Sequence, residues 1–210
     1  QNPAHPYLAV IGGKKAEEKI GGLFGLLPHV DAFLIGGGVA YTFLVNKRLK
    51  VGDSIVAAEY LDEAKRFVAA AYARGASVVL PRDVQLTQAL GEGAEAVIAP
   101  ANKIPDGWMG ADIGPETAKD FQRRLRRAKT VFWAGPLGAF EHPPFDRGTV
   151  EVARSLARGE AFVVVGGGET GAAFARAGVQ AEHIFVSTGG GAALAYAAGA
   201  RLPGLVALAG

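Results

Sequence analysis

Four clusters of glycine, each separated by at most two residues from the end of a short apolar run, restrict the fold of this chain more than any other feature. The apolar runs are 7–11, 32–35, 161–165 and 183–186, and the glycine clusters are 12–13, 36–38, 166–168 and 189–191. Runs that are apolar at nearly every position are typical of strands buried on both faces, as in a parallel sheet covered by helices. Glycine after such a strand allows a sharp turn and lets a ligand approach without meeting a Cβ. Because open α/β sheets bind ligands at the carboxyl ends of their strands, the pattern predicts a site for an anion and favours a nucleotide.

The remaining pattern indicates one α/β domain. We expect further strands at 77–80, 96–99 and 130–133, with helices at 14–27, 39–46, 58–74, 116–128, 149–157, 170–177 and 192–198. Strands that alternate with helices are typical of βαβ units. The predicted fold class is therefore a doubly wound, mostly parallel sheet with helices on both faces, Rossmann-like, in a single domain.

Composition excludes several function classes. The chain has 210 residues, half of them hydrophobic, which suits one sizeable core. It contains no cysteine, so disulfides and thiolate metal sites are excluded. A formal charge of only +2 predicts no nucleic-acid or membrane partner, and the basic run at 122–127 is interpreted as a solvated helix end. The first residues lack the pattern of a signal peptide, so we expect a soluble cytoplasmic protein. We also expect a monomer.

Two lysines at helical spacing are candidates for binding phosphate. Lys15 and Lys19 lie four residues apart, on one face of a helix that starts just after a strand. Two ammonium groups beside the free N–H groups of a helix amino terminus suit successive phosphates of one nucleotide. An ordinary charged helix has the same spacing, and from spacing alone that interpretation is favoured.

Two further strings leave alternatives open. Residues 166–171 match G-x-G-x-x-G between a strand and a helix, as in an NAD-binding domain. The match is weak in a chain so rich in glycine, and no acidic residue stands about 20 positions further on. The string 133–141 ends a strand, turns at Gly135-Pro136 and reaches Glu141, whose carboxylate suits ribose hydroxyls. Taken alone, a solvated glutamate after a turn fits equally well.

Six strings together resemble the phosphoglycerate kinase family, in its carboxyl-terminal, nucleotide-binding domain. They are IGGxKxxxKI at 11–20, LIGGGxAYTFL at 34–44, IPxGWMGxDIGP at 104–115, WxGPxGxFE at 133–141, VGGG at 165–168 and VSTGGGA at 186–192. The resemblance covers essentially the whole chain, in order and with the family's spacing. It implies that residues 1–210 form that domain and that the amino-terminal domain, which binds 3-phosphoglycerate, is absent.

The resemblance also implies a role for particular residues. Enzymes of this family transfer a phosphoryl group between 1,3-bisphosphoglycerate and Mg-ADP in glycolysis. The residues implied in transfer are Lys19 and, through their N–H groups, Gly189, Gly190 and Gly191. Those implied in binding ADP or ATP are Lys15 near the α-phosphate, Gly12, Gly13, Gly36 and Gly37 in the pocket floor, Ile55, Pro136 and Leu137 at base and ribose, Glu141 at the ribose hydroxyls, and Thr170 at the phosphates. Glu169 is the implied ligand of Mg²⁺ carried by the nucleotide.

Three positions depart from the family's usual residues. Lys14 stands in place of alanine, Ala134 in place of asparagine, and Glu169 in place of aspartate. We expect the fold and pocket to survive, with altered nucleotide affinity and metal preference. Without the triose-binding wall we expect nucleotide binding with little or no turnover. The alternatives are an NAD-binding dehydrogenase domain and a catalytically silent domain.

Overall fold

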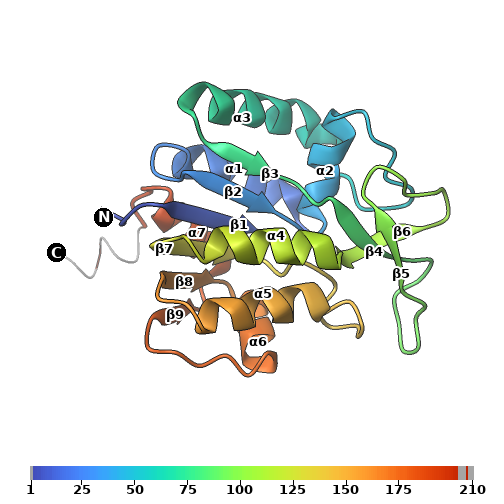
Figure 1. Cartoon of the computed structure of the whole chain (residues 1–210). Coiled ribbons are helices and arrows are strands. Elements are labelled where there is room, and N and C mark those ends of the chain that lie inside the picture. The colour runs from blue at the N-terminus through green and yellow to red at the C-terminus, as the bar shows by residue number, and fades with distance from the viewer. Residues whose placement is uncertain (1, 203–206, 208–210) are drawn as a thin grey trace.

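A six-stranded sheet forms the centre of the protein (Figure 1). The computed structural model describes residues 2–202 and 207. The sheet contains β1 (Tyr7–Ile11), β2 (Ala32–Ile35), β3 (Ser77–Val79), β7 (Thr130–Ala134), β8 (Phe162–Gly166) and β9 (Ile184–Ser187). Its strand order is β3-β2-β1-β7-β8-β9, and each neighbouring pair is parallel. The predicted doubly wound α/β fold is confirmed.

Helices cover both faces of this sheet and bury a separate core on each. One core holds side chains from α1 (Ala16–Leu26), α2 (Val39–Asn46), α3 (Leu61–Arg74, after a 3-10 turn at Ala58–Tyr60) and α7 (Gly190–Ala197). The other holds side chains from α4 (Pro115–Leu125), α5 (Arg147–Ala157) and α6 (Gly168–Arg176). Strand β1 supplies Ala9 and Ile11 to the first core and Leu8 and Val10 to the second, as alternation along a strand requires.

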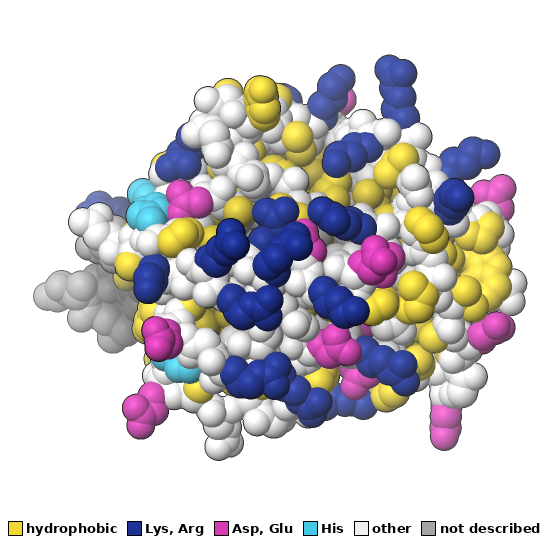
Figure 2. Space-filling view, viewed as in Figure 1, with side chains coloured by type: hydrophobic (Ala, Val, Ile, Leu, Met, Phe, Trp, Pro, Cys, Tyr) yellow, Lys and Arg dark blue, Asp and Glu magenta, His cyan; other side chains and the backbone are white. Residues whose placement is uncertain are grey.

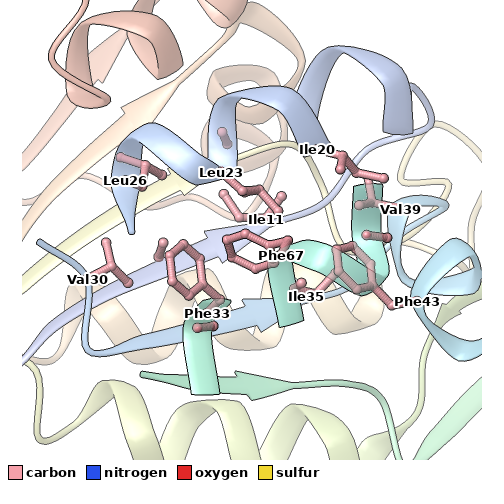
Figure 3. Packing of buried hydrophobic residues seen from close by; sticks show 14 of the residues in the cluster. Ile11, Ile20, Leu23, Leu26, Val30, Phe33, Ile35, Val39, Phe43 and Phe67 are labelled. Atoms are coloured by element: carbon pink, nitrogen blue, oxygen red, sulfur yellow. The ribbon is translucent and has the colours of Figure 1, made fainter. Parts of the chain in front are cut away.

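The first core has an aromatic centre (Figure 3). The ring of Phe67 meets Phe33, Phe24 and Phe43 edge to face, with centroids 4.9, 5.5 and 6.2 Å apart. Such geometry places the positive edge of one ring on the negative face of another. Phe67 therefore fixes α3 on the sheet.

The segment between β3 and α4 was predicted only in part. Three strands there, β4 (Asp83–Thr87), β5 (Val97–Pro100) and β6 (Met109–Ile113), form a separate antiparallel sheet in the order β5-β4-β6. The prediction that 96–99 belongs to a continuous alternation of strands and helices was wrong, and β4 and β6 were not predicted. Figure 1 shows this small sheet beyond the carboxyl ends of the parallel strands, beside α2.

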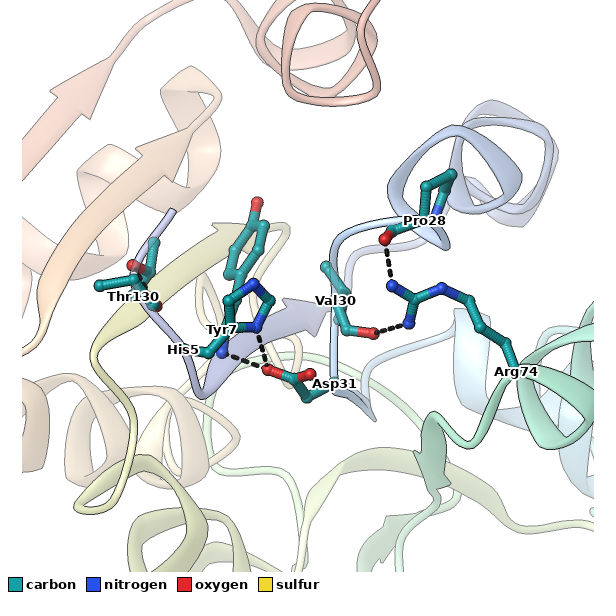
Figure 4. A network of polar contacts seen from close by, with 8 residues as sticks. His5, Tyr7, Pro28, Val30, Asp31, Arg74 and Thr130 are labelled. Carbon is teal, nitrogen blue, oxygen red and sulfur yellow. Dashed lines mark hydrogen bonds and ion pairs between the residues drawn. The ribbon is translucent and has the colours of Figure 1, made fainter. Parts of the chain in front are cut away.

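A polar network holds the amino end of β1 (Figure 4). The Asp31 carboxylate pairs with His5 Nδ1 at 2.7 Å and accepts the Tyr7 N–H at 2.7 Å. Partial burial alone would raise the pKa of Asp31, but these two hydrogen bonds and the charges of His5 and Arg74 together lower it. Arg74 donates to two carbonyls of the turn between α1 and β2. The start of the central strand is thus tied to the end of α3.

Lysine and arginine side chains gather on the face over α4 and α5 (Figure 2). Part of the basic run at 122–127 is structural, because Arg123 and Arg124 both donate to Asp120, whose side chain is 6% exposed. Burial alone would raise the pKa of Asp120, but the hydrogen bond and charge of Arg124, with the charge of Arg123, lower it. Within the part of the chain that the structure describes, no helix is long and apolar enough to cross a membrane.

Candidate functional site

A hollow lies where the loops after β1, β2 and β7 meet the small sheet. Its walls include Gly13 and Lys14 after β1, Gly37 and Gly38 after β2, and the segment from Pro136 to Glu141 after β7. Met109, Gly110, Ala111 and Asp112 of β6 close one side, and Glu169 lies at the start of α6. The parallel strands place their carboxyl ends at one edge, which is where open α/β sheets bind ligands.

Glycine lets the loops that form this hollow touch through their backbones. The Gly13 N–H donates to Pro136 O at 2.7 Å, and the Gly37 N–H donates to Leu137 O at 3.0 Å. A Cβ on Gly12 would lie 2.2 Å from Pro136 O, which is too close for any side chain. These hydrogen bonds occupy the amides of Gly13 and Gly37, so both glycines contribute surface to the hollow and their N–H groups bind the neighbouring loop.

Gly12 and Gly36 lie behind the hollow. The Gly12 N–H donates to Ala134 O at 2.9 Å, and the Gly36 N–H donates to Ile11 O at 2.8 Å. A Cβ on Gly36 would lie 2.6 Å from Cδ2 of Leu137, a side chain fully buried in the core. Leu137 therefore supports the loop from below, and its side chain does not face the hollow as the expected contact with a base requires.

The other residues expected at base and ribose do border the hollow. Ile55 is 54% exposed and faces it from the segment between α2 and α3. Pro136 and Ala139 border it from the loop after β7. Glu141 stands at the mouth, where its Oε1 lies 3.6 Å from the Lys14 Nζ.

The two candidate lysines lie beside the hollow at the start of α1. Lys15 is the residue before the helix and is exposed. Lys19 is half-buried, and its Cε is 3.9 Å from where a Cβ on Gly13 would stand. The Lys19 side chain thus reaches back over the wall of the hollow. The amino end of α1 adds the partial positive charge of a helix terminus.

The amino ends of α6 and α7 lie next to each other. Gly190 Cα would be 3.2 Å from a Cβ on Gly167, just before α6. Gly189 is the residue before α7, while Gly190 and Gly191 form its first turn, whose N–H groups have no partner within a helix. Glu169 is exposed in the first turn of α6.

Thr170 follows Glu169 in the first turn of α6, and its hydroxyl is hydrogen-bonded within the protein. Its side chain is buried, its hydroxyl accepts the Gly135 N–H at 2.8 Å, and it donates to Gly166 O at 3.1 Å. The hydroxyl therefore holds the loop after β7 against the end of β8, and both of its hydrogen-bonding roles are already in use.

Asp112 is a buried acid at the hollow that the sequence reasoning did not single out. Its Oδ2 accepts the Gly148 N–H at 2.7 Å and its Oδ1 accepts the Ile113 N–H at 2.8 Å. Burial raises the pKa of Asp112 well above its usual range, despite the lowering effect of these two bonds. Burial also raises the pKa of Tyr41, and the Asp112 charge adds to that shift. A lone acid inside the apolar run at 109–113 was the available signal.

Three carboxylates border the hollow, those of Asp112, Glu141 and Glu169. In the described ranges, 2–202 and 207, no three His, Cys, Asp or Glu side chains gather into a metal site. Mg²⁺ is commonly held by one or two carboxylates together with substrate phosphates. Glu169 provides one.

Fold and site together define the class: an open, doubly wound α/β protein with a ligand hollow at the carboxyl edge of its parallel sheet. The model of the family described as phosphoglycerate kinase matches residues 1–200. The chain belongs to the phosphoglycerate kinase family.

Relatives and solved structures agree with this assignment. A phosphoglycerate kinase of Thermus thermophilus is 47% identical over 211 residues, covering 100% of this chain and 54% of the relative. That of Nautilia profundicola is 44% identical over 208 residues, covering 99% of this chain and 52% of the relative. The structure of phosphoglycerate kinase from Coxiella burnetii superimposes with a TM-score of 0.93 at 36% identity, covering 100% of this chain and 54% of that one. The chain thus spans about half the length of the curated relatives it matches.

Proposed function

We propose that this chain is the nucleotide-binding half of a phosphoglycerate kinase and binds Mg-ADP and Mg-ATP. The observation that carries the proposal is the hollow at the carboxyl edge of the sheet, which Lys19 flanks and to which Glu141 and Glu169 contribute. A cationic flank suits phosphates, and two separate carboxylates suit a sugar and a metal ion. Residues 1–210 would form the carboxyl-terminal domain.

The nucleotide would lie with its base against Ile55, Pro136 and Ala139 and its ribose hydroxyls on Glu141. The α-phosphate would lie near Lys15, and the phosphoryl group in transit would lie near Lys19. The N–H groups of Gly189, Gly190 and Gly191 would receive that group at the amino end of α7. Glu169 would hold the Mg²⁺ that the phosphates carry. Gly12, Gly36, Leu137 and Thr170 would act as supports that keep the loops of the hollow together.

The half that binds 3-phosphoglycerate would stand opposite this hollow in the whole enzyme. Phosphoryl transfer depends on positioning and on stabilisation of charge, and both need the second substrate held in line. This chain alone would therefore bind nucleotide with little turnover. As part of a glycolytic enzyme it would work in the cytoplasm, and we expect it to be a monomer.

An NAD-binding dehydrogenase domain is the main alternative, and the topology argues against it. The dinucleotide fingerprint belongs to the first βα turn of its fold. Here the G-x-G-x-x-G string follows β8, whereas the turn after β1 carries Gly12-Gly13-Lys14-Lys15. NAD is therefore the proper competitor in a binding test.

Calorimetric titration of the chain with ADP, with and without Mg²⁺, tests the proposal. We expect ADP to bind, NAD not to displace it, and Lys15→Ala to weaken binding by about tenfold, as loss of a charge-assisted hydrogen bond predicts. Lys65→Ala, which removes an exposed lysine on α3, is the matched control and should bind as the parent chain does. Failure of the folded chain to bind ADP at millimolar concentration would refute the proposed function and leave a catalytically silent domain.

A further inference from the structure

An ion pair crosses the mouth of the hollow. Lys14 belongs to the loop between β1 and α1, and Glu141 lies within the loop between β7 and α5. The Lys14 Nζ is 3.6 Å from the Glu141 Oε1, with the two side chains 56% and 39% exposed. Both residues line the hollow, so a ligand that enters contacts or displaces both side chains.

A ligand that hydrogen-bonds to Glu141 competes with the Lys14–Glu141 ion pair. Ribose hydroxyls that donate to Glu141 compete with the Lys14 ammonium for the two carboxylate oxygens and weaken the contact between Lys14 and Glu141. The separated ammonium returns to water, and the Coulombic attraction of the pair is lost. A ligand therefore keeps its full binding free energy only if it brings a new anion for Lys14.

Lys14 is placed where such an anion would arrive. Its Cα would lie 3.2 Å from a Cβ on Gly38, so at Lys14 the loop after β1 meets the loop after β2. The amino end of α1 follows immediately, with Lys15 and Lys19. An exposed lysine side chain changes rotamer within nanoseconds, so exchange of Glu141 for a phosphate oxygen needs no movement of the backbone.

We propose that Lys14 is a specificity-determining residue that makes the use of Glu141 conditional on a polyphosphate, and so discriminates against nucleosides. The proposal rests on the nucleotide site proposed above. A nucleoside breaks the Lys14–Glu141 pair without replacing it. A nucleoside diphosphate breaks the pair and gives Lys14 a phosphate in return.

Affinities for adenosine and ADP, measured with Lys14→Ala and the parent chain, test the idea. Exposed ion pairs change binding equilibria by about twofold to fivefold. We expect Lys14→Ala to bind adenosine more tightly by about that factor and ADP more weakly by a similar one, so that the ratio of the two affinities falls by about fourfold or more. Because the pair is exposed, 1 M NaCl should remove most of the difference between parent and variant.

Two further variants isolate the ion pair. In a Glu141→Gln background, Lys14→Ala should no longer improve adenosine binding, because the partner charge is already gone. Lys65→Ala removes the same charge at a distance from the hollow and should leave the ratio unchanged.

The outcomes separate the two proposals. If the parent chain binds no ADP, the nucleotide site and the role of Lys14 both fall. If ADP binds but Lys14→Ala keeps the parent ratio, or if the variant's effect on adenosine persists in the Glu141→Gln background, only the role of Lys14 is overturned.

Discussion

Replacement of Gly12 by alanine should separate the loops that form the hollow. A Cβ there would lie 2.2 Å from Pro136 O and 2.8 Å from Gly135 O, whereas ordinary contacts begin at 3.4 Å. Both neighbours are backbone atoms, so the loop after β7 has to move by about 1 Å, a shift of the size that overpacking forces on a backbone. The movement would stretch the 2.7 Å hydrogen bond from Gly13 N to Pro136 O.

The magnitude follows from these contacts. Overpacking of this kind lowers the free energy of unfolding by about 1–3 kcal/mol. Because the substitution also weakens a buried hydrogen bond, we expect Gly12→Ala to lower the unfolding free energy by about 3 kcal/mol, the upper end of that range. For a chain of this size that is a fall in Tm of about 6–12 °C. Because the walls of the hollow separate, ADP binding should weaken by about tenfold or more.

Thermal unfolding followed by circular dichroism and calorimetric titration with ADP measure the two effects. Gly13→Ala is a graded comparison, because its φ of +91° strains an alanine while its nearest Cβ contact is 3.6 Å. It should lower stability by about 1–2 kcal/mol. Gly91→Ala, with nothing within 4 Å of the added Cβ, is the control. If Gly12→Ala has the same Tm as Gly91→Ala and the ADP affinity of the parent chain, the inference that the two loops lie too close for a side chain is refuted.

Substitutions at three further positions, Thr170, Asp112 and Phe67, test the hydrogen bonds and packing described above. Thr170→Val leaves the buried Gly135 N–H without its acceptor and should lower the unfolding free energy by about 1–3 kcal/mol in urea titrations. Thr170→Ser should restore most of it, and an equal loss in both variants would contradict the role of the hydroxyl. The raised pKa of Asp112 means that the folded chain holds this proton more tightly, so stability falls as pH rises from about 4 through the folded pKa. Asp112→Asn should lack that fall, so in urea titrations across pH 4 to 8 the difference in unfolding free energy, parent minus variant, should shrink as pH rises. A difference that stays constant with pH would count against it. Phe67→Ala should lower the unfolding free energy by about 3–5 kcal/mol. On the same helix Tyr72→Ala, at a side chain 85% exposed, should change it little, and similar losses would exclude the aromatic centre as the cause.

The parallel sheet was predictable because its strands are apolar at nearly every position. The small sheet was not, since β4 places Asp83, Gln85 and Thr87 at alternate positions, as a half-exposed strand would. All five of its residues are buried, and Asp83 is accommodated because it accepts the N–H groups of Glu116 at 3.0 Å and Thr117 at 2.8 Å. The donors that make burial of Asp83 possible lie more than 30 residues away in the chain, so no periodicity within the strand reveals its burial.

For the site, the sequence indicated which segments meet and not which atoms remain available. Thr170 and Gly13 follow apolar runs as phosphate-binding residues do, yet their polar groups bond to the neighbouring backbone. The Lys14–Glu141 pair depends on the placement of β1 beside β7, which only the sheet order provides. Local patterns therefore predicted which edge of the sheet carries the hollow, while only the three-dimensional structure shows which polar groups there already bond within the protein.

The position of β1 also affects how the chain is made. All five residues of β1 are buried, between β2 and β7, and the partner on one side is about 120 residues further along. At ribosomal rates of about 5–20 residues per second, one edge of this apolar strand waits roughly 6–24 seconds for its neighbour. Unpaired apolar strand edges are the segments that aggregate, so the nascent chain passes through its most vulnerable period before β7 emerges. Ribosome-bound chaperones would therefore matter most for the first two thirds of the translation of this domain.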